Sequence, residues 1–281
     1  MQLYQVDAFT NRPFAGNPAA VCLVPSPQPE AWMQQVAQEM NLSETAFVQR
    51  LENLSRSGAH QFNLRWFTPT TEVDLCGHAT LASAHVLLSE GYLPEDAAIE
   101  FQTRSGPLTA RSTAAGIELN FPATPVPAAS APPGLLDALG ITAAPEFVGK
   151  SRFDYLIEVA SEAQVRQMQP NFRELRHLPV RGIIVTSRGE SSSSAGDAYD
   201  MVSRFFAPGS GIDEDPVTGS AHCALGPFWQ SRLGKAELLA YQASPRGGEL
   251  RLLCQGDRVL LRGRAVTVLK GELSAADGEL P

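Results

Sequence analysis

Alternating apolar and polar positions predict β-strands along much of the chain. The segments with this two-residue period are residues 2–9, 19–24, 45–49 and 61–67. A loop rich in Gly, Pro and Asn separates the first two segments. Near the end of the sequence, residues 258–273 predict two short strands that meet at Gly263.

Two segments have the pattern of helices instead. Residues 29–40 begin with Pro and Glu, which suit a first helical turn, and their apolar side chains recur on one face. Residues 79–88 are apolar nearly all round and are followed by Gly91, a residue typical of helix ends. A helix without a polar face is buried on every side, so the second segment predicts a central helix.

A strand–loop–helix pattern occurs twice. Residues 65–69 (RWFTP) resemble residues 204–208 (RFFAP), and the offset is close to half the chain length. Each segment is followed by an acidic loop and then by a helix start with small residues, at 77–79 and at 219–221. We interpret the pattern as a duplicated α+β domain, each copy with one buried helix wrapped by sheet. The alternative is a chance likeness between two strand–loop–helix units.

A segment rich in Pro and Ala, residues 122–134, predicts the domain boundary because it favours neither helix nor sheet. The predicted domains are residues 1–121 and 122–261. The last strands, residues 262–277, are expected to return to the first domain. A Ser-rich segment within residues 186–197 predicts a mobile surface loop.

Composition and charge exclude several classes of function. The net charge is −8 and no basic stripe is present, which argues against nucleic acid or an anionic membrane as a partner. No apolar run approaches the ~20 residues that span a bilayer, and the start does not resemble a signal peptide. The expected location is therefore the cytoplasm. The four cysteines form no C-x-x-C pair, so neither a zinc ribbon nor a redox motif is indicated.

The two helix starts are candidate anion sites. A helix N-terminus carries about half a positive charge, and its free N–H groups can bind a carboxylate without Lys or Arg. The backbone at Gly77, His78, Gly219 and Ser220 would supply these groups. The simpler interpretation is that Thr80 or Ser220 caps its own helix.

Glu44 is the candidate acid/base. It precedes an apolar strand segment, where burial would raise its pKa towards neutrality. Alternatively it is a solvated turn residue or the capping-box partner of Asn41. Asp215 precedes the second helix start, where it either favours the helix terminus or accepts a hydrogen bond from a substrate.

Other chemistries lack their motifs. Asp215, Ser220 and His78 could be imagined as a hydrolase triad, but the G-x-S-x-G motif is absent. His78 and His85 are too far apart for an i, i+4 zinc pair, and His85 is expected to be a core histidine with a partner. No glycine-rich nucleotide loop is present. We therefore expect neither a metal nor an organic cofactor.

The sequence resembles the phenazine-biosynthesis (PhzF-like) family nearly end to end. The resemblance rests on seven ordered segments: residues 6–9, 14–21, 41–47, 75–80, 204–208, 214–221 and 242–248. It implies the diaminopimelate-epimerase-like fold, an α+β fold of two pseudo-symmetric domains, each a β-roll around a central buried helix, with the site between them. It also implies chemistry like the cofactor-free isomerisation of a dihydro-hydroxyanthranilate.

The resemblance assigns roles to individual residues. The proton-shuttling glutamate of the family carries onto Glu44, its histidine onto His78, and its aspartate and serine onto Asp215 and Ser220. Epimerases of this fold use one cysteine from each half. Here Cys76 occupies the first loop, but the second loop offers no thiol, and Cys223 is expected in the core. A two-thiol racemase is therefore disfavoured.

The predicted function is a proton transfer within a small carboxylate, cyclic or amino-acid-like, catalysed by an isomerase. A lyase or dehydratase acting on a similar acid, and a catalytically silent carboxylate-binding protein, are the alternatives. A homodimer is the candidate assembly. The predicted catalytic residues are Glu44, His78 and Asp215, and the predicted substrate-binding residues are Asn17, Gly77, His78, Gly219 and Ser220.

Overall fold

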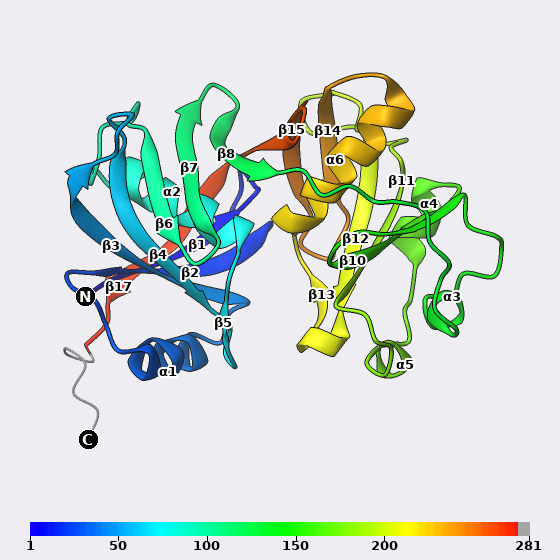
Figure 1. Cartoon of the computed structure of the whole chain (residues 1–281), viewed down its shortest axis with the longest axis horizontal. Coiled ribbons are helices and arrows are strands. Elements are labelled where there is room, and N and C mark those ends of the chain that lie inside the picture. Colours follow the sequence, from blue (N-terminus) through cyan, green and yellow to red (C-terminus); the bar gives the residue numbers. More distant parts are fainter. Residues whose placement is uncertain (275–281) are drawn as a thin grey trace. The chain divides into compact units, whose positions relative to one another are not determined.

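The computed structural model describes residues 1–274, and the chain divides into two compact units. The first contains Met1–Asn120 and the chain from Arg262 onward, and the second contains Phe121–Leu261 (Figure 1). Residues 275–277 of the predicted returning segment lie outside the described residues. No helix within residues 1–274 has the length and apolar character needed to cross a membrane.

The first unit is built mainly of strands. Its elements are β1 (Gln2–Ala8), β2 (Asn17–Val24), α1 (Glu30–Met40), β3 (Glu44–Leu54), β4 (His60–Phe67), β5 (Glu72–Val73), α2 (Gly77–Ser89), β6 (Ile99–Thr103), β7 (Gly106–Thr113), β8 (Gly116–Pro122) and β17 (Ala265–Glu272). Strand β1 pairs antiparallel with both β2 and β17. Strands β2 and β3 are parallel, as are β4 and β6, and each parallel pair is joined through a helix.

Helix α2 is the central helix of this unit. Every residue from Gly77 to Leu88 except His85 is buried, and the helix contacts β1, β2, β3, β7 and β17. The apolar sequence all round the helix explains this position, so the prediction of a buried helix is confirmed. The predicted partner of His85 is present as well, because its Nε2 lies 3.1 Å from the hydroxyl of Thr267.

The opposite face of the sheet is covered by α1. Trp32, Met33 and Val36 of this helix pack in one apolar cluster with Phe47 of β3 and Cys22 of β2. Because side chains alternate along a strand, residues 44 and 46 of β3 project towards α2, whereas residues 45 and 47 project towards α1. The two faces of this sheet therefore carry different sets of functional groups.

The second unit repeats the order of the first. Its elements are α3 (Leu135–Ala138), β9 (Phe147–Lys150), β10 (Asp154–Glu158), α4 (Glu162–Gln167), α5 (Phe172–Leu175), β11 (Gly182–Arg188), β12 (Met201–Ala207), η1 (Pro208–Ser210), β13 (Ile212–Asp215), α6 (Gly219–Leu233), β14 (Glu237–Gln242), β15 (Gly248–Gln255) and β16 (Arg258–Gly263). Strands β10 and β11 are parallel, β11 and β12 antiparallel, and β12 and β14 parallel with α6 between them in sequence. The same sequence of pairings connects β2, β3, β4 and β6 around α2.

A matching ion pair marks the duplication. Arg65 of β4 forms a bidentate pair with Glu72 of β5, at 2.7 and 2.6 Å. Arg204 of β12 forms the same pair with Glu214 of β13, at 2.7 and 2.8 Å. The equivalent strands and ion pairs establish two pseudo-symmetric α+β halves, as the sequence predicted.

Several local predictions need correction. The strand expected at 45–49 runs from Glu44 to Leu54, and the strand expected from residue 19 begins at Asn17. The segment 122–134 is more than a hinge, since Ala129 N–H bonds to the Val148 carbonyl of β9 at 3.0 Å. The segment 186–197 begins inside β11 and is anchored by the Ser191 hydroxyl, which donates to Glu162 at 2.6 Å.

Candidate active site

Three chain segments bring functional groups together at the start of α2. Asn17 is the first residue of β2, Glu44 the first residue of β3, and His78 the second residue of α2. In the parallel pair formed by β2 and β3, Ala19 lies opposite Glu44, so both strands start at the same edge. The chain enters β2 through Gly16, whose φ is +65°, and a Cβ there would collide with the Ala8 carbonyl oxygen.

His78 is the centre of the cluster. Its Nε2 lies 3.2 Å from a carboxylate oxygen of Glu44. Its Nδ1 lies 3.1 Å from the side-chain amide nitrogen of Asn17 and 3.5 Å from the sulfur of Cys76. The Glu44 side chain is 13% exposed, and Asn17, Cys76 and His78 are buried. The cluster thus joins a carboxylate, a thiol and an imidazole in a largely dry site.

The imidazole of His78 is neutral at neutral pH. Burial lowers its pKa to about 3, because the charged ring would lose its hydration. The NH₂ group of Asn17 and the thiol of Cys76 are donors, and both lie at Nδ1. With the Asn17 amide nitrogen at Nδ1, the tautomer that satisfies this contact has the lone pair on Nδ1 and the proton on Nε2, on the side of Glu44. His78 can therefore donate a hydrogen bond from Nε2 without carrying charge.

A second buried histidine lies in the second unit. His222 of α6 is 0% exposed, its Nδ1–H donates to the Thr218 carbonyl at 2.8 Å, and burial lowers its pKa to about 4. Both histidines have a folded pKa below the ordinary value of about 6.5. The unfolded chain therefore takes up these protons first, and the stability that they contribute above pH ~6.5 is lost as the pH falls.

As the pH falls from ~6 to ~4.5, we expect each histidine to lower the free energy of unfolding by about 1.4 kcal/mol per pH unit. His222→Asn keeps a donor near Nδ1 but removes the titration. Urea unfolding at several pH values gives the free energy of unfolding as a function of pH, and this dependence should be less steep by about that amount in His222→Asn. An unchanged slope would contradict a neutral His222 in the folded state.

The starts of the two long helices are not capped by side chains. No side-chain cap bond forms at Cys76 before α2 or at Thr218 before α6 within the described chain. Thr80 donates its hydroxyl to the Cys76 carbonyl at 2.5 Å, and it does not accept from a first-turn N–H in any cap bond. The alternative in which Thr80 or Ser220 caps its own helix is therefore wrong.

Asp215 and its surroundings belong to the second unit. Asp215 ends β13, is buried and accepts a 2.5 Å hydrogen bond from the Thr218 hydroxyl. Ser220 is the second residue of α6, directly after Gly219. That Asp215 and Ser220 contact a substrate stays a prediction. That both helix starts serve one site also stays a prediction.

Gln242 is a structural partner that the sequence analysis missed. This buried residue ends β14, donates to the Asp215 carbonyl at 2.7 Å and accepts from the Thr218 N–H at 2.8 Å. It thus fixes the loop between β13 and α6. The sequence did contain one indication of this role, a single polar residue directly after the apolar segment 238–241.

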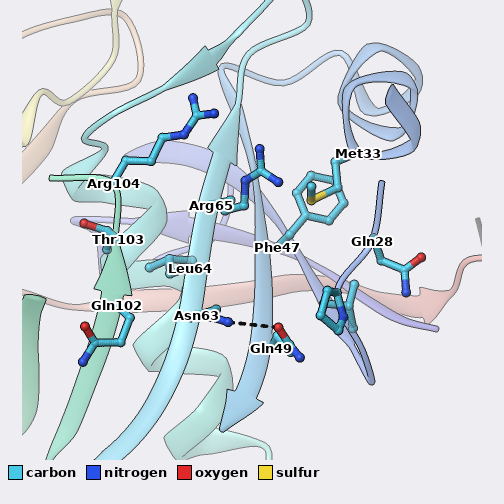
Figure 2. A pocket seen from close by; sticks show the side chains of 12 residues that line it. Gln28, Met33, Phe47, Gln49, Asn63, Leu64, Arg65, Gln102, Thr103 and Arg104 are labelled. Atoms are coloured by element: carbon cyan, nitrogen blue, oxygen red, sulfur yellow. Dashed lines mark hydrogen bonds between the residues drawn. The ribbon is translucent and has the colours of Figure 1, made fainter. Parts of the chain in front are cut away.

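A pocket of about 420 Å³ lies on the other face of the first sheet (Figure 2). It is lined by Phe47, Gln49, Asn63, Arg65 and Arg104, among others, with Met33 of α1 beside Phe47. Glu44 is three residues from Phe47 and projects to the opposite face of β3. The cluster at His78 is therefore separate from this pocket.

The cysteines also follow the sequence-based expectation. Cys223 lies in α6, is 4% exposed, and burial raises the pKa of its thiol to about 12. Such a thiol is a poor proton carrier at neutral pH. Cys76, in contrast, borders the cluster of Glu44 and His78.

Comparison with known proteins places this architecture in a family. A family model described as phenazine biosynthesis-like protein matches residues 6–271. The chain belongs to the phenazine biosynthesis-like family. An uncharacterized isomerase of Halalkalibacterium halodurans is 53% identical over 272 residues, which cover 96% of this chain and 97% of that protein.

Solved structures agree with this assignment. The crystal structure of a phenazine biosynthesis protein of the PhzF family from Enterococcus faecalis is 40% identical, with a TM-score of 0.87, and the match covers 97% of this chain and 98% of that one. A predicted epimerase of Pseudomonas aeruginosa, 19% identical with a TM-score of 0.71 over 98% of this chain and 99% of that one, shares the fold. This phenazine biosynthesis-like chain thus has the diaminopimelate-epimerase-like fold that its sequence predicted.

Proposed function

We propose that the chain is a cofactor-independent isomerase that moves a proton within a small carboxylate, with Glu44 as the acid/base. The observation that carries the proposal is the contact of the Glu44 carboxylate with Nε2 of a neutral histidine, 3.2 Å away, at the uncapped start of α2. A carboxylate in this place can take up and return one proton while a neutral donor stabilises developing charge beside it.

The reaction would proceed in two proton transfers. Glu44 would remove a proton from a carbon next to an unsaturated or carbonyl group, and the electron pair of the broken C–H bond would delocalise into that group. His78 would donate a hydrogen bond from Nε2–H to the resulting negative charge or to Glu44 itself. The protonated Glu44, whose side chain is 13% exposed and can exchange its proton with solvent, would then deliver a proton to a second carbon, so the product is an isomer of the substrate.

The helix start supports the proposed substrate class. The N-terminal turn of α2, at Gly77 and His78, is the proposed binding point for the carboxylate, because its backbone N–H groups and dipole favour an anion. Asp215 and Ser220 are proposed to orient the substrate, with Thr218 and Gln242 as the residues that position Asp215. The proposed substrate is a cyclic or amino-acid-like carboxylate.

A panel of small unsaturated and cyclic carboxylic acids, followed by ¹H NMR, tests the proposal. An isomerase should give a product of unchanged mass with a relocated C–H or C=C group. A lyase or dehydratase would give a product lighter by the leaving group, and a binding protein would bind a carboxylate without a product. Binding of uncharged compounds alone, measured by titration calorimetry, would contradict the carboxylate site.

Asn17 is proposed to act through His78 rather than on the substrate. It is 0% exposed, and its amide nitrogen faces Nδ1 of the ring. Asn17→Asp would replace this donor by an acceptor and so favour a proton on Nδ1. We expect kcat to fall by roughly 10- to 100-fold with little change in KM, as for the partners that orient other functional histidines.

The readout for Asn17 is the ¹⁵N NMR spectrum of the His78 ring, which distinguishes the two tautomers. The spectrum of the natural protein should show the proton on Nε2, and that of Asn17→Asp should show a shift of the proton towards Nδ1. Asn120→Asp, a change of the same type at a partly buried site on β8, serves as the control. Equal spectra in the natural protein and Asn17→Asp would contradict the positioning role.

A further inference from the structure

The cluster of Glu44, Cys76 and His78 has the composition of a metal site. One carboxylate oxygen, one sulfur and one imidazole nitrogen all lie within 4.8 Å of one another. We propose that this cluster reversibly binds a thiophilic divalent ion of the zinc class, and that the bound ion inhibits the enzyme. The binding is independent of the proposed function, whereas the inhibition rests on it.

The ligand atoms lie close enough for a small rearrangement to form a tetrahedral site. Zinc–ligand bonds of about 2.0 to 2.3 Å place neighbouring ligand atoms roughly 3.3 to 3.8 Å apart. The contacts of His78 with Glu44 at 3.2 Å and with Cys76 at 3.5 Å are already near this range. They involve different ring nitrogens, so an ion bound through one nitrogen needs the sulfur or the carboxylate to move towards that nitrogen. The three ligand atoms all lie within 4.8 Å of one another, against roughly 3.3 to 3.8 Å in a bound site.

Metal binding requires a free lone pair on each ligand. A neutral imidazole supplies one from a single ring nitrogen. If the ion takes Nε2, the ring proton moves to Nδ1, and the amide of Asn17 can turn its oxygen towards it. The thiol of Cys76 must lose its proton, so one proton is released to solvent for each bound ion.

The ligand types select the class of metal. Sulfur and imidazole ligands favour zinc and related ions, whereas magnesium and calcium require sites composed of oxygen atoms. Three protein ligands leave the fourth position open to water, so the ion is expected to be removable by a chelator. An ion on Glu44 occupies the lone pair that would accept the substrate proton, which is why binding would stop turnover.

Cobalt(II) titration of the purified chain tests the site without any substrate. We expect one equivalent of cobalt to produce the near-ultraviolet absorption band of a cobalt–thiolate bond, zinc to displace it and magnesium to leave it unchanged. The band should be absent in Cys76→Ser. His78→Gln and Glu44→Gln should bind cobalt at least about 10-fold more weakly.

The matched control is Cys254→Ser, at a buried cysteine of β15 in the second unit, which should leave the band unchanged. Circular dichroism of each variant confirms that it is folded. A band that persists in Cys76→Ser, or no band at one equivalent, overturns the metal site.

The inhibition is measured separately, on the carboxylate identified as substrate. Zinc should inhibit turnover, a chelator should restore it, and Cys76→Ser should be at least about 10-fold less sensitive to zinc relative to its own uninhibited rate. Zinc that binds to the cluster without inhibiting would contradict the inhibition and the role of Glu44, but not the metal site. If the natural protein isomerised its substrate but gave no cobalt band, the metal site would be overturned and the proposed function would stand.

Discussion

Glu44→Gln is expected to reduce turnover by about 10²- to 10⁴-fold, the usual effect of removing a general acid/base. Glutamine keeps the size of the side chain and can still contact His78, but it cannot take up and return a proton. Because the proposed carboxylate site is made of backbone groups, the affinity for substrate should change little. Turnover by NMR and binding by calorimetry on the same variant separate the two effects.

Two further variants calibrate the result. Glu44→Asp keeps the carboxylate but shortens its side chain by about one bond length. Its turnover should lie between that of the natural protein and that of Glu44→Gln. Glu52→Gln changes an exposed glutamate of the same strand and should leave turnover unchanged. If turnover survived in Glu44→Gln, the proton carrier would be another group, with Asp215 or Cys76 as the next candidates.

Arg204→Met is expected to lower the free energy of unfolding by about 3 to 5 kcal/mol, the effect of breaking a buried ion pair by removing one partner. The Arg204 side chain is 9% exposed and that of Glu214 is 13% exposed. Arg204 also donates to the Met168 carbonyl at 2.7 Å. Removing the guanidinium therefore leaves a carboxylate and a carbonyl, both shielded from water, without this hydrogen-bond donor.

The repeat supplies the control for this prediction. Arg65 makes the same bidentate pair with Glu72, but its side chain is 32% exposed, and Arg104 also binds Glu72 at 2.7 Å. Glu72 keeps a partner in Arg65→Met, so the loss should be at most about 1 kcal/mol. Urea unfolding of both variants gives the comparison. Equal losses would show that burial does not determine the strength of these two pairs.

Local sequence predicted the architecture where the pattern was strong. The apolar residues around α2 and the repeated Arg-aromatic-Phe motif were sufficient for a buried helix and a duplicated fold. The same approach predicted none of the strands β6 to β8, although they follow α2 directly, and it placed the start of β2 two residues late. Strand boundaries depend on pairing with segments distant in sequence, and periodicity does not contain this information.

The sequence predicted only part of the candidate site, because contacts between segments distant in sequence complete it. The motif around Glu44 singled out the residue, and the helix-start motif singled out His78. Their contact exists because β3 and α2 pack together in three dimensions. The place of Asn17 beside Nδ1, and of Gln242 beneath Asp215, likewise arises from residues that are far apart in the chain.

Deuterium transfer from solvent tests the central claim most directly. The natural protein and Glu44→Gln would each be incubated in D₂O with the substrate, and the deuterium content of each carbon would be followed by NMR and mass spectrometry. Glu44 as the acid/base predicts deuterium at the newly protonated carbon in the natural protein and incorporation at least about 100-fold slower in Glu44→Gln. Incorporation at equal rates in the two proteins would contradict the account.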